Sequence, residues 1–117
     1  MILSEIAVIL KARFLFGEEM GAKEIFRIGA SDLMSDLLTA DSAGSLILTG
    51  LATQQAVRAA SIAGASAIVL IRGKIPPREI IDLAGEENIP LLTTPLSMFV
   101  ASGRLYMHEL KGLNNGR

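Results

Sequence analysis

The chain has 117 residues, of which 50% are hydrophobic, and its 11 basic and 12 acidic side chains leave a net charge of −1. This length suits a single domain that buries its core without disulfides or metal, and the scattered, balanced charge argues against a nucleic acid partner. Because the sequence has no cysteine and His108 is its one histidine, thiolate chemistry is excluded, and neither a metal site nor a cofactor is expected.

The first residues give no sign of export or membrane insertion. Residues 1–10 contain Glu5 and lack both a basic leader and a cleavage site. No apolar run approaches the ~18 residues that a membrane-spanning helix needs. We therefore expect a cytoplasmic protein that does not bind membranes.

The N-terminal part is predicted to hold a helix, two short strands and a further short helix. Ser4, followed by apolar residues at helical spacing, predicts a helix over 4–10. Two apolar runs predict strands over 13–16 and 25–28, and we expect these strands to pair with each other. A short helix is then expected after Asp32, whose charge suits a helix N-terminus.

A unit made of an apolar run, a turn and a helical stretch occurs three times. Its even spacing suits a strand, a turn and a crossover helix, so it predicts βαβ units. We therefore expect the α/β class: a largely parallel sheet flanked by helices, with the N-terminal helix and two short strands, in one domain over 1–117. The runs and their turns are Leu46-Ile47-Leu48 with Thr49-Gly50, 67–71 with Arg72-Gly73, and 89–92 with Thr93-Thr94-Pro95.

Caps and apolar spacing predict the helices of these units. One begins near Thr53 and runs to residue 62 or 63. The next starts at Pro77, which suits a first helical turn, and stops by Asn88. The polar tail 112–117 is expected to fray.

The last helix, after Thr94-Pro95, has two apolar faces. One face has no charged guard, and we expect it to form a homodimer interface. In the alternative, the N-terminal helix covers this face. The unguarded face carries Met98, Ala101 and Leu105, and the other carries Leu96, Phe99, Val100, Gly103 and Met107.

The carboxyl ends of the predicted parallel strands are the expected binding site. Ligands settle at this edge of open α/β sheets, where backbone amides meet an anion, and here Arg72 and Lys74 would add positive charge. In the alternative interpretation the threonines cap helices, the glycines form turns and the basic pair is only solvated. The residues gathered at this edge are Thr49, Gly50, Arg72, Gly73, Lys74, Thr93 and Thr94.

The sequence does not predict catalysis. It contains neither a G-x-x-x-x-G-K-[ST] phosphate loop nor a G-x-G-x-x-G turn after a strand. Ser31, Ser35 and Ser97 have no histidine near them in sequence to act as a base. We interpret Asp32, Asp36 and Asp41 as a cap, a solvated helix face and a loop residue, not as a magnesium or acid–base cluster.

Residues 45–110, with "SLILTG" and "AGASAIVLIRGKIPPREIIDLAGEENIPLLTTPLSMFVASGRLY", resemble the DRTGG domain family, especially its small stand-alone members. Those members are similar to the N-terminal, non-catalytic domain of HPr kinase/phosphorylase. The stretches "LSEIAVILKARFLFGEE" and "IGASDLMSDLL" also look like the start of the stand-alone proteins, and "IPLLTTPLSMFVASGRL" is the most specific part.

The resemblance implies an α/β domain that binds or regulates and does not transfer phosphate. In multidomain relatives the domain accompanies CBS modules, pyrophosphatases and phosphotransacetylases, which implies sensing of a small anionic metabolite or nucleotide. Stand-alone relatives encoded near iron-hydrogenase components imply a larger redox enzyme as partner. The hypotheses are therefore a homodimeric regulatory module with a small ligand, an adaptor docking on a larger enzyme, and an enzyme whose substrate completes its site.

The chain departs from the letters that name the family. They describe an Asp-Arg pair after one strand and a Thr-Gly-Gly after the next. This chain has Leu51-Ala52 after Gly50, and Ile71-Arg72-Gly73 at the second place. Either the ligand of the acidic–basic pair is lost here, or its charge has moved to Arg72 and Lys74.

Overall fold

A computed structural model describes residues 1–37 and 42–113, which form one mixed sheet with helices on both faces. The strands are β1 (Arg13–Phe16), β2 (Arg27–Ala30), β3 (Ser45–Thr49), β4 (Ala67–Leu70), β5 (Leu91–Thr93) and β6 (Lys111–Gly112). The helices are α1 (Leu3–Ile9), the 3-10 turn η1 (Glu18–Met20), α2 (Met34–Leu37), α3 (Gln54–Ile62), α4 (Arg78–Glu86) and α5 (Met98–Met107).

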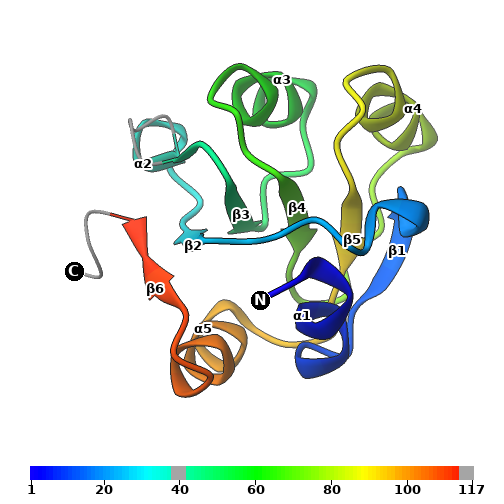
Figure 1. Cartoon of the computed structure of the whole chain (residues 1–117). Coiled ribbons are helices and arrows are strands. Elements are labelled where there is room, and N and C mark those ends of the chain that lie inside the picture. The colour runs from blue at the N-terminus through cyan, green and yellow to red at the C-terminus, as the bar shows by residue number, and fades with distance from the viewer. Residues whose placement is uncertain (38–41, 114–117) are drawn as a thin grey trace.

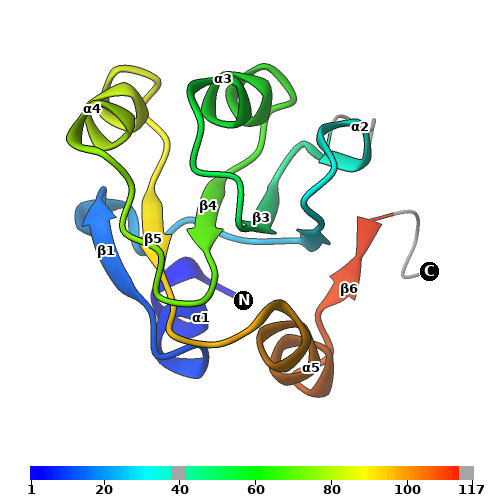
Figure 2. The same cartoon turned by 180° about the vertical axis from the view of Figure 1, so that it is seen from behind.

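The strand order in the sheet is β1-β5-β4-β3-β2-β6. All neighbours are parallel except β1, which lies antiparallel to β5 at one edge. Helices α2, α3 and α4 cover one face, while α1 and α5 cover the other (Figures 1 and 2). Crossovers of one hand put successive helices on the same face, and α5 changes face because the chain returns to the far edge to add β6. The predicted α/β class with a largely parallel sheet is confirmed.

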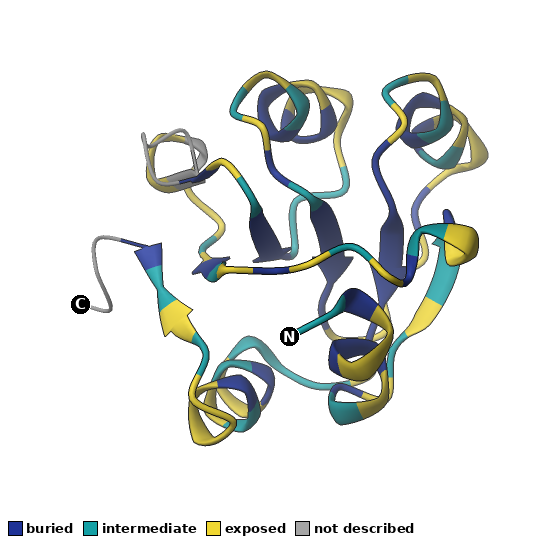
Figure 3. Cartoon of the chain, viewed as in Figure 1, coloured by how far each residue is buried: buried dark blue, intermediate teal, exposed yellow. Residues whose placement is uncertain are grey.

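The core lies on both faces of the sheet. Every residue of β3 and β4 is buried, as Figure 3 shows, and this is typical of parallel strands covered on both sides. Leu48 and Val69 point to a cluster that includes α1 and α5. Ile47 and Ile68 point to a second cluster with α3 and α4. Alternate residues of the same strands therefore fill both layers.

Side-chain caps fix where α3 and α5 begin. The Thr53 hydroxyl accepts a hydrogen bond from the Ala56 amide at 3.1 Å, and α3 starts as predicted. The Ser97 hydroxyl does the same for the Val100 amide at 3.1 Å, so α5 begins at Met98 and not directly after Pro95. Capping of this kind satisfies amides that have no helical partner.

The prediction that the two N-terminal strands pair with each other is wrong. β1 pairs with β5, and β2 pairs with β3 and β6, so they lie on different sides of the sheet. The segment between them contains η1 and is too long for a tight hairpin turn. Each strand instead gains a partner in the buried centre of the sheet.

The prediction that Met98, Ala101 and Leu105 form a dimer interface is also wrong. Ala101 and Leu105 are fully buried in the cluster under the sheet, and Met98 packs against it. The opposite side of α5 faces solvent instead, with Phe99 87% and Met107 83% exposed. A face with the small Ala101 packs closer to a sheet than a face with the bulkier Phe99 and Met107 would. The dimer itself stays a prediction.

The chain continues beyond α5 into the short strand β6 at one edge of the sheet. Gly112 pairs with Ile28 in β6, and the buried Leu113 lies so close to Gly29 that a Cβ there would be 2.9 Å from a Leu113 methyl. The expectation that 112–117 frays stays a prediction, and residues 114–117 lie outside the described part. Among the described helices none is long and apolar enough to cross a bilayer.

Candidate functional site

The loops that follow β2, β3, β4 and β5 meet at one rim of the sheet. Leu48 of β3 is in register with Ala30 of β2 and Val69 of β4, and Val69 is in register with Leu92 of β5. Because these strands are parallel, their carboxyl ends point the same way. The prediction that the turns after the three repeated strands share an edge is confirmed, and we call this edge the carboxyl rim.

Hydrogen bonds join the loop after β4 to the loop after β5. The Arg72 amide donates to the Leu96 carbonyl at 2.8 Å, and the Gly73 amide donates to the Thr94 carbonyl at 2.7 Å. In return, the Thr93 hydroxyl donates to the Lys74 carbonyl at 2.8 Å. The two loops therefore form one fixed support for the side chains of Arg72 and Lys74.

The three threonines of the predicted site are buried and hold the loops. The Thr94 hydroxyl donates to the Leu10 carbonyl and accepts from the Leu96 amide. The Thr49 hydroxyl donates to an Asp32 carboxylate oxygen at 3.1 Å and accepts from the Leu51 amide at 3.1 Å. These contacts connect the rim to the end of α1 and to the loop after β2.

The rim amides that we expected to be free are engaged inside the protein. The Gly50 amide donates to Asp32 at 2.6 Å, the Lys74 amide donates to the Ile71 carbonyl, and those of Arg72 and Gly73 bond the neighbouring loop. Half-buried loops satisfy their own backbone in this way. These four amides are therefore not free to bind an anion, which would meet the side chains of Arg72 and Lys74 instead.

Asp32 belongs to the rim, although the sequence analysis left it out of the site. One of its carboxylate oxygens, Oδ1, accepts from both Thr49 and Gly50, and the side chain is exposed. Ala30 of β2 is in register with Leu48 of β3, and Asp32 and Gly50 each follow this pair by two residues. This position is the signal in the sequence that Asp32 belongs to the site, whereas its charge before a short helix indicates only a cap.

Asp32 and Arg72 approach Gly50 from two neighbouring loops. A Cβ on Gly50 would lie 3.2 Å from the Arg72 Nη2 atom and 3.3 Å from Asp32 Oδ1. Gly50 therefore forms a floor between a carboxylate and a guanidinium. The two charged groups are not joined as an ion pair in the described part of the chain.

Arg72 holds an unusual backbone conformation. Its φ is 57°, in the left-handed region that glycine adopts freely and other residues adopt at a cost, and Gly73 follows with φ 66°. Hydrogen bonds from both amides keep the turn in place. Such strain at a fixed, exposed position is typical of functional sites.

Apolar side chains accompany the charged ones along the rim. Leu33 follows Asp32 and is 63% exposed, and Ile75 follows Lys74 and is 55% exposed. Leu51, after Gly50, is half-buried. The rim therefore combines positive charge, one carboxylate and apolar surface.

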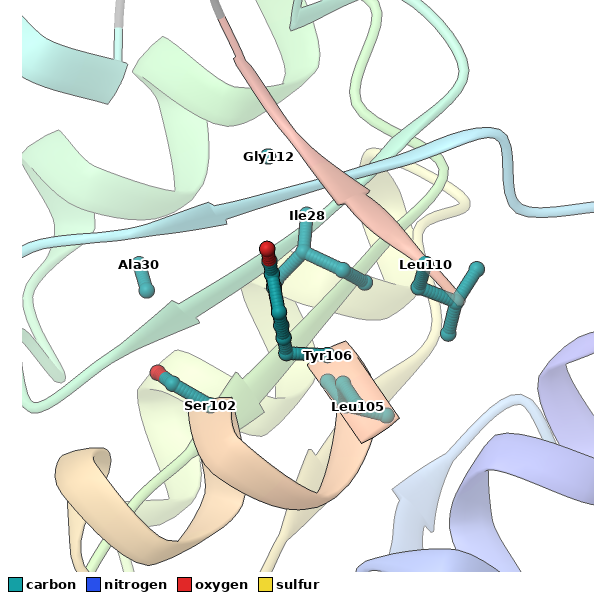
Figure 4. Close-up of a pocket in the computed structure, with 7 residues that line it drawn as sticks. All are labelled: Ile28, Ala30, Ser102, Leu105, Tyr106, Leu110 and Gly112. Atoms are coloured by element: carbon teal, nitrogen blue, oxygen red, sulfur yellow. The ribbon is translucent and has the colours of Figure 1, made fainter. Parts of the chain in front are cut away.

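Other clusters in the described residues offer less. Figure 4 shows a cavity of about 120 Å³ between α5, β2 and β6. Asp36 accepts from the Ser31 hydroxyl at 2.9 Å, while Asp41 lies outside the described residues. Three or more acidic or histidine side chains do not gather anywhere in 1–37 or 42–113. The cavity is lined by Ile28, Ala30, Ser102, Leu105, Tyr106, Leu110 and Gly112.

Comparison with protein families gives a match over residues 5–107 to the DRTGG domain. The chain belongs to the DRTGG domain family. A similar solved structure is that of the CBS and DRTGG domains of the regulatory region of Clostridium perfringens pyrophosphatase, complexed with its activator, diadenosine tetraphosphate. It has a TM-score of 0.72 and 23% identity, and the match covers 97% of this chain and 51% of that chain. The curated proteins give no match.

The left-handed turn explains one part of the DRTGG letters. Arg72 and Gly73 stand where the name has its two glycines, and both have positive φ. In this DRTGG domain the turn places an arginine where a glycine would be free of strain. The other part of the name, an Asp-Arg pair after Gly50, is replaced by Leu51-Ala52. Around the same glycine, Asp32 and Arg72 supply an acidic and a basic group from other loops.

Proposed function

We propose that this DRTGG domain is a non-catalytic regulatory module that binds a small anionic metabolite or nucleotide at the carboxyl rim. The observation that carries the proposal is the Arg72 guanidinium, held over Gly50 by a turn whose backbone is strained. Lys74, on the same turn, adds an exposed positive charge. The nucleotide activator bound to the similar pyrophosphatase region supports a ligand of this class.

The residues divide into two roles under this proposal. Arg72 and Lys74 contact the ligand, and Gly50 leaves the space that it occupies. The second role is to hold the loops in position. The hydroxyls that do so donate hydrogen bonds inside the protein and belong to Thr49, Thr93 and Thr94. The list of ligand-binding residues expected from sequence thus stays a prediction, and the hydrogen bonds of the threonines support its division into two roles. Gly73 belongs to the second group.

Thermal melting with a panel of adenine nucleotides and phosphorylated metabolites tests the proposal. A ligand at about 100 times its Kd adds about 2.7 kcal/mol to the free energy of unfolding, which raises Tm by several degrees. Arg72→Ala should remove the shift, while Arg78→Ala, an exposed arginine on α4, should keep it. If no member of the panel raises Tm, the proposal fails.

A second candidate is an interaction module, and the exposed apolar face of α1 and α5 favours it. Val8 and Met107 line a groove between these helices with Ile9, Arg104 and His108. Phe99 lies two turns before Met107 on the same side of α5 and is exposed. The occupant would be a second copy, giving the predicted homodimer, or a larger, redox-type enzyme.

Sedimentation and co-purification separate these occupants. If a second copy binds this face, the wild-type chain sediments as a dimer and Met107→Glu sediments as a monomer with unchanged Tm. If an enzyme binds it, the chain is monomeric and retains a stoichiometric enzyme on purification from its host, which Met107→Glu releases. A monomer with no retained enzyme contradicts this candidate and leaves the regulatory ligand-binding module.

A further inference from the structure

We infer that the carboxyl rim recognises a ribose phosphate, with Asp32 binding the sugar hydroxyls and Arg72 binding the phosphate. The inference rests on the proposed function and adds to it a residue and a ligand class. It follows from an acceptor, Asp32 Oδ1, and a cationic donor, Arg72 Nη2, which lie 3.3 and 3.2 Å from the position that a Cβ on Gly50 would take. Ribose 5-phosphate and the nucleotides that contain it share this chemistry.

Asp32 is prepared to accept hydrogen bonds from a ligand. Two contacts, from the Thr49 hydroxyl and the Gly50 amide, fix its Oδ1 atom and therefore the plane of the carboxylate. An ionised carboxylate has more lone pairs than these two bonds use. Its side chain is exposed. The remaining acceptor sites suit adjacent sugar hydroxyls, as an acidic residue does for ribose in dinucleotide folds.

Arg72 is prepared to bind the phosphate. A guanidinium has five donors in a fixed fork that matches phosphate oxygens. The hydrogen bonds of Arg72 and Gly73 to the next loop fix the turn from which it projects, and Lys74 adds charge from the same turn. Asp32, beside the same glycine, disfavours a ligand that is only an anion. The pair therefore selects a ligand with hydroxyl donors next to its negative group.

The apolar residues of the rim extend the site in the way a nucleobase requires. Leu33 and Ile75 directly follow Asp32 and Lys74 in sequence, and both are more than half exposed. A flat base stacks on such side chains at little cost in solvation. We therefore expect adenosine 5′-monophosphate to bind more tightly than ribose 5-phosphate alone, and both more tightly than inorganic phosphate.

Calorimetric titration of the full chain with four probes tests this inference. The probes are adenosine 5′-monophosphate, its 2′,3′-dideoxy analogue, ribose 5-phosphate and inorganic phosphate. Loss of the hydroxyls should weaken the binding of the monophosphate about tenfold or more. This is the loss of affinity expected when hydrogen bonds to a charged group are removed. Asp32→Asn keeps an oxygen for Thr49 and Gly50 but removes the charge, so it should bind the two monophosphates alike.

Asp36→Asn is the matched control, because this aspartate contacts Ser31 and not Gly50. It should keep the wild-type preference for the ribose form. Equal affinity of wild type for the ribose and dideoxy forms, or unchanged preference in Asp32→Asn, overturns the inference while the anion-binding function stands. Phosphate binding as tightly as the nucleotide also overturns it. If no probe binds, both the inference and nucleotide binding at the rim fail.

Discussion

Arg72 occupies a backbone position that favours glycine, and its side chain lies beside Gly50 at the carboxyl rim. The left-handed conformation costs a non-glycine residue about 1–2 kcal/mol. Packing does not explain the choice of residue, because the side chain is exposed. Lys11, Asn88 and Glu109 also have positive φ, and Arg72 differs from them in lying beside Gly50 at the rim, where its guanidinium is able to meet a ligand.

Replacing Arg72 by glycine should separate stability from binding. Glycine removes the strain, which stabilises the folded chain, and it raises the entropy of the unfolded chain, which offsets part of this gain. The variant should therefore be more stable than wild type by up to about 1 kcal/mol. It should lose the nucleotide-dependent rise in Tm. Chemical denaturation and melting with adenosine 5′-monophosphate measure the two effects.

Asn88→Gly provides the control for strain alone. Asn88 also has a positive φ, 55°, but lies between α4 and β5, at the other end of the strands. This variant should gain stability without losing the ligand response. A wild-type ligand response in Arg72→Gly would show that the site lies elsewhere.

Gly50→Ala should block the site and leave the fold intact. The added methyl would meet only the ends of the Arg72 and Asp32 side chains, at 3.2 and 3.3 Å, so a shift of a few tenths of an ångström relieves the contact. We expect a stability change below about 1 kcal/mol and a loss of affinity for adenosine 5′-monophosphate of about tenfold or more. Gly103→Ala on α5, where the methyl meets open space, should bind normally. Equal affinity of the Gly50 and Gly103 variants for adenosine 5′-monophosphate would contradict the role of Gly50 as the floor of the site.

At the scale of elements, the repeated strand and turn pattern predicted the sheet and the rim, because alternation and turn residues are local signals. Strand pairing joins residues that are far apart in sequence, so local signals do not predict which strands β1 and β2 pair with. The two faces of α5 are both apolar, and which one packs depends on how closely Ala101 lets the helix approach the sheet. Asp32 was missed for the same reason, since its partner Gly50 comes from another loop.

Thr94 lies in the loop after β5, which is joined to the loop after β4, and its hydroxyl should add measurably to the free energy of unfolding. Thr94→Val keeps the side-chain shape but leaves the buried Leu10 carbonyl without its donor. We expect a loss of about 1–3 kcal/mol in the free energy of unfolding. Thr53→Val, which removes only the exposed cap of α3, should cost about 1 kcal/mol. If Thr94→Val unfolds at the same denaturant concentration as wild type, the hydroxyl does not support the rim.

The whole molecule is held together by strands that serve two layers. β3 and β4 contribute alternate residues to both apolar clusters, and the first and last described elements, α1 and β6, pack on or pair with the same sheet. Neither layer is complete without the other. The chain should therefore behave as one cooperative unit.

Calorimetry tests this cooperativity. The calorimetric and van't Hoff enthalpies of unfolding should agree within error, as for a two-state domain. A separate, earlier transition that exposes α1 and α5 would contradict it. In that case these two helices would form an independent layer over a sheet stabilised mainly by α3 and α4.

The most direct test of ligand binding at the carboxyl rim is an NMR titration of the ¹⁵N-labelled chain with adenosine 5′-monophosphate. The largest shifts should belong to the amides of Gly50, Arg72, Gly73 and Lys74, which lie next to the proposed phosphate and sugar positions. Shifts confined to α1 and α5, or to the cavity beside β6, would contradict the assignment of the rim as the binding site.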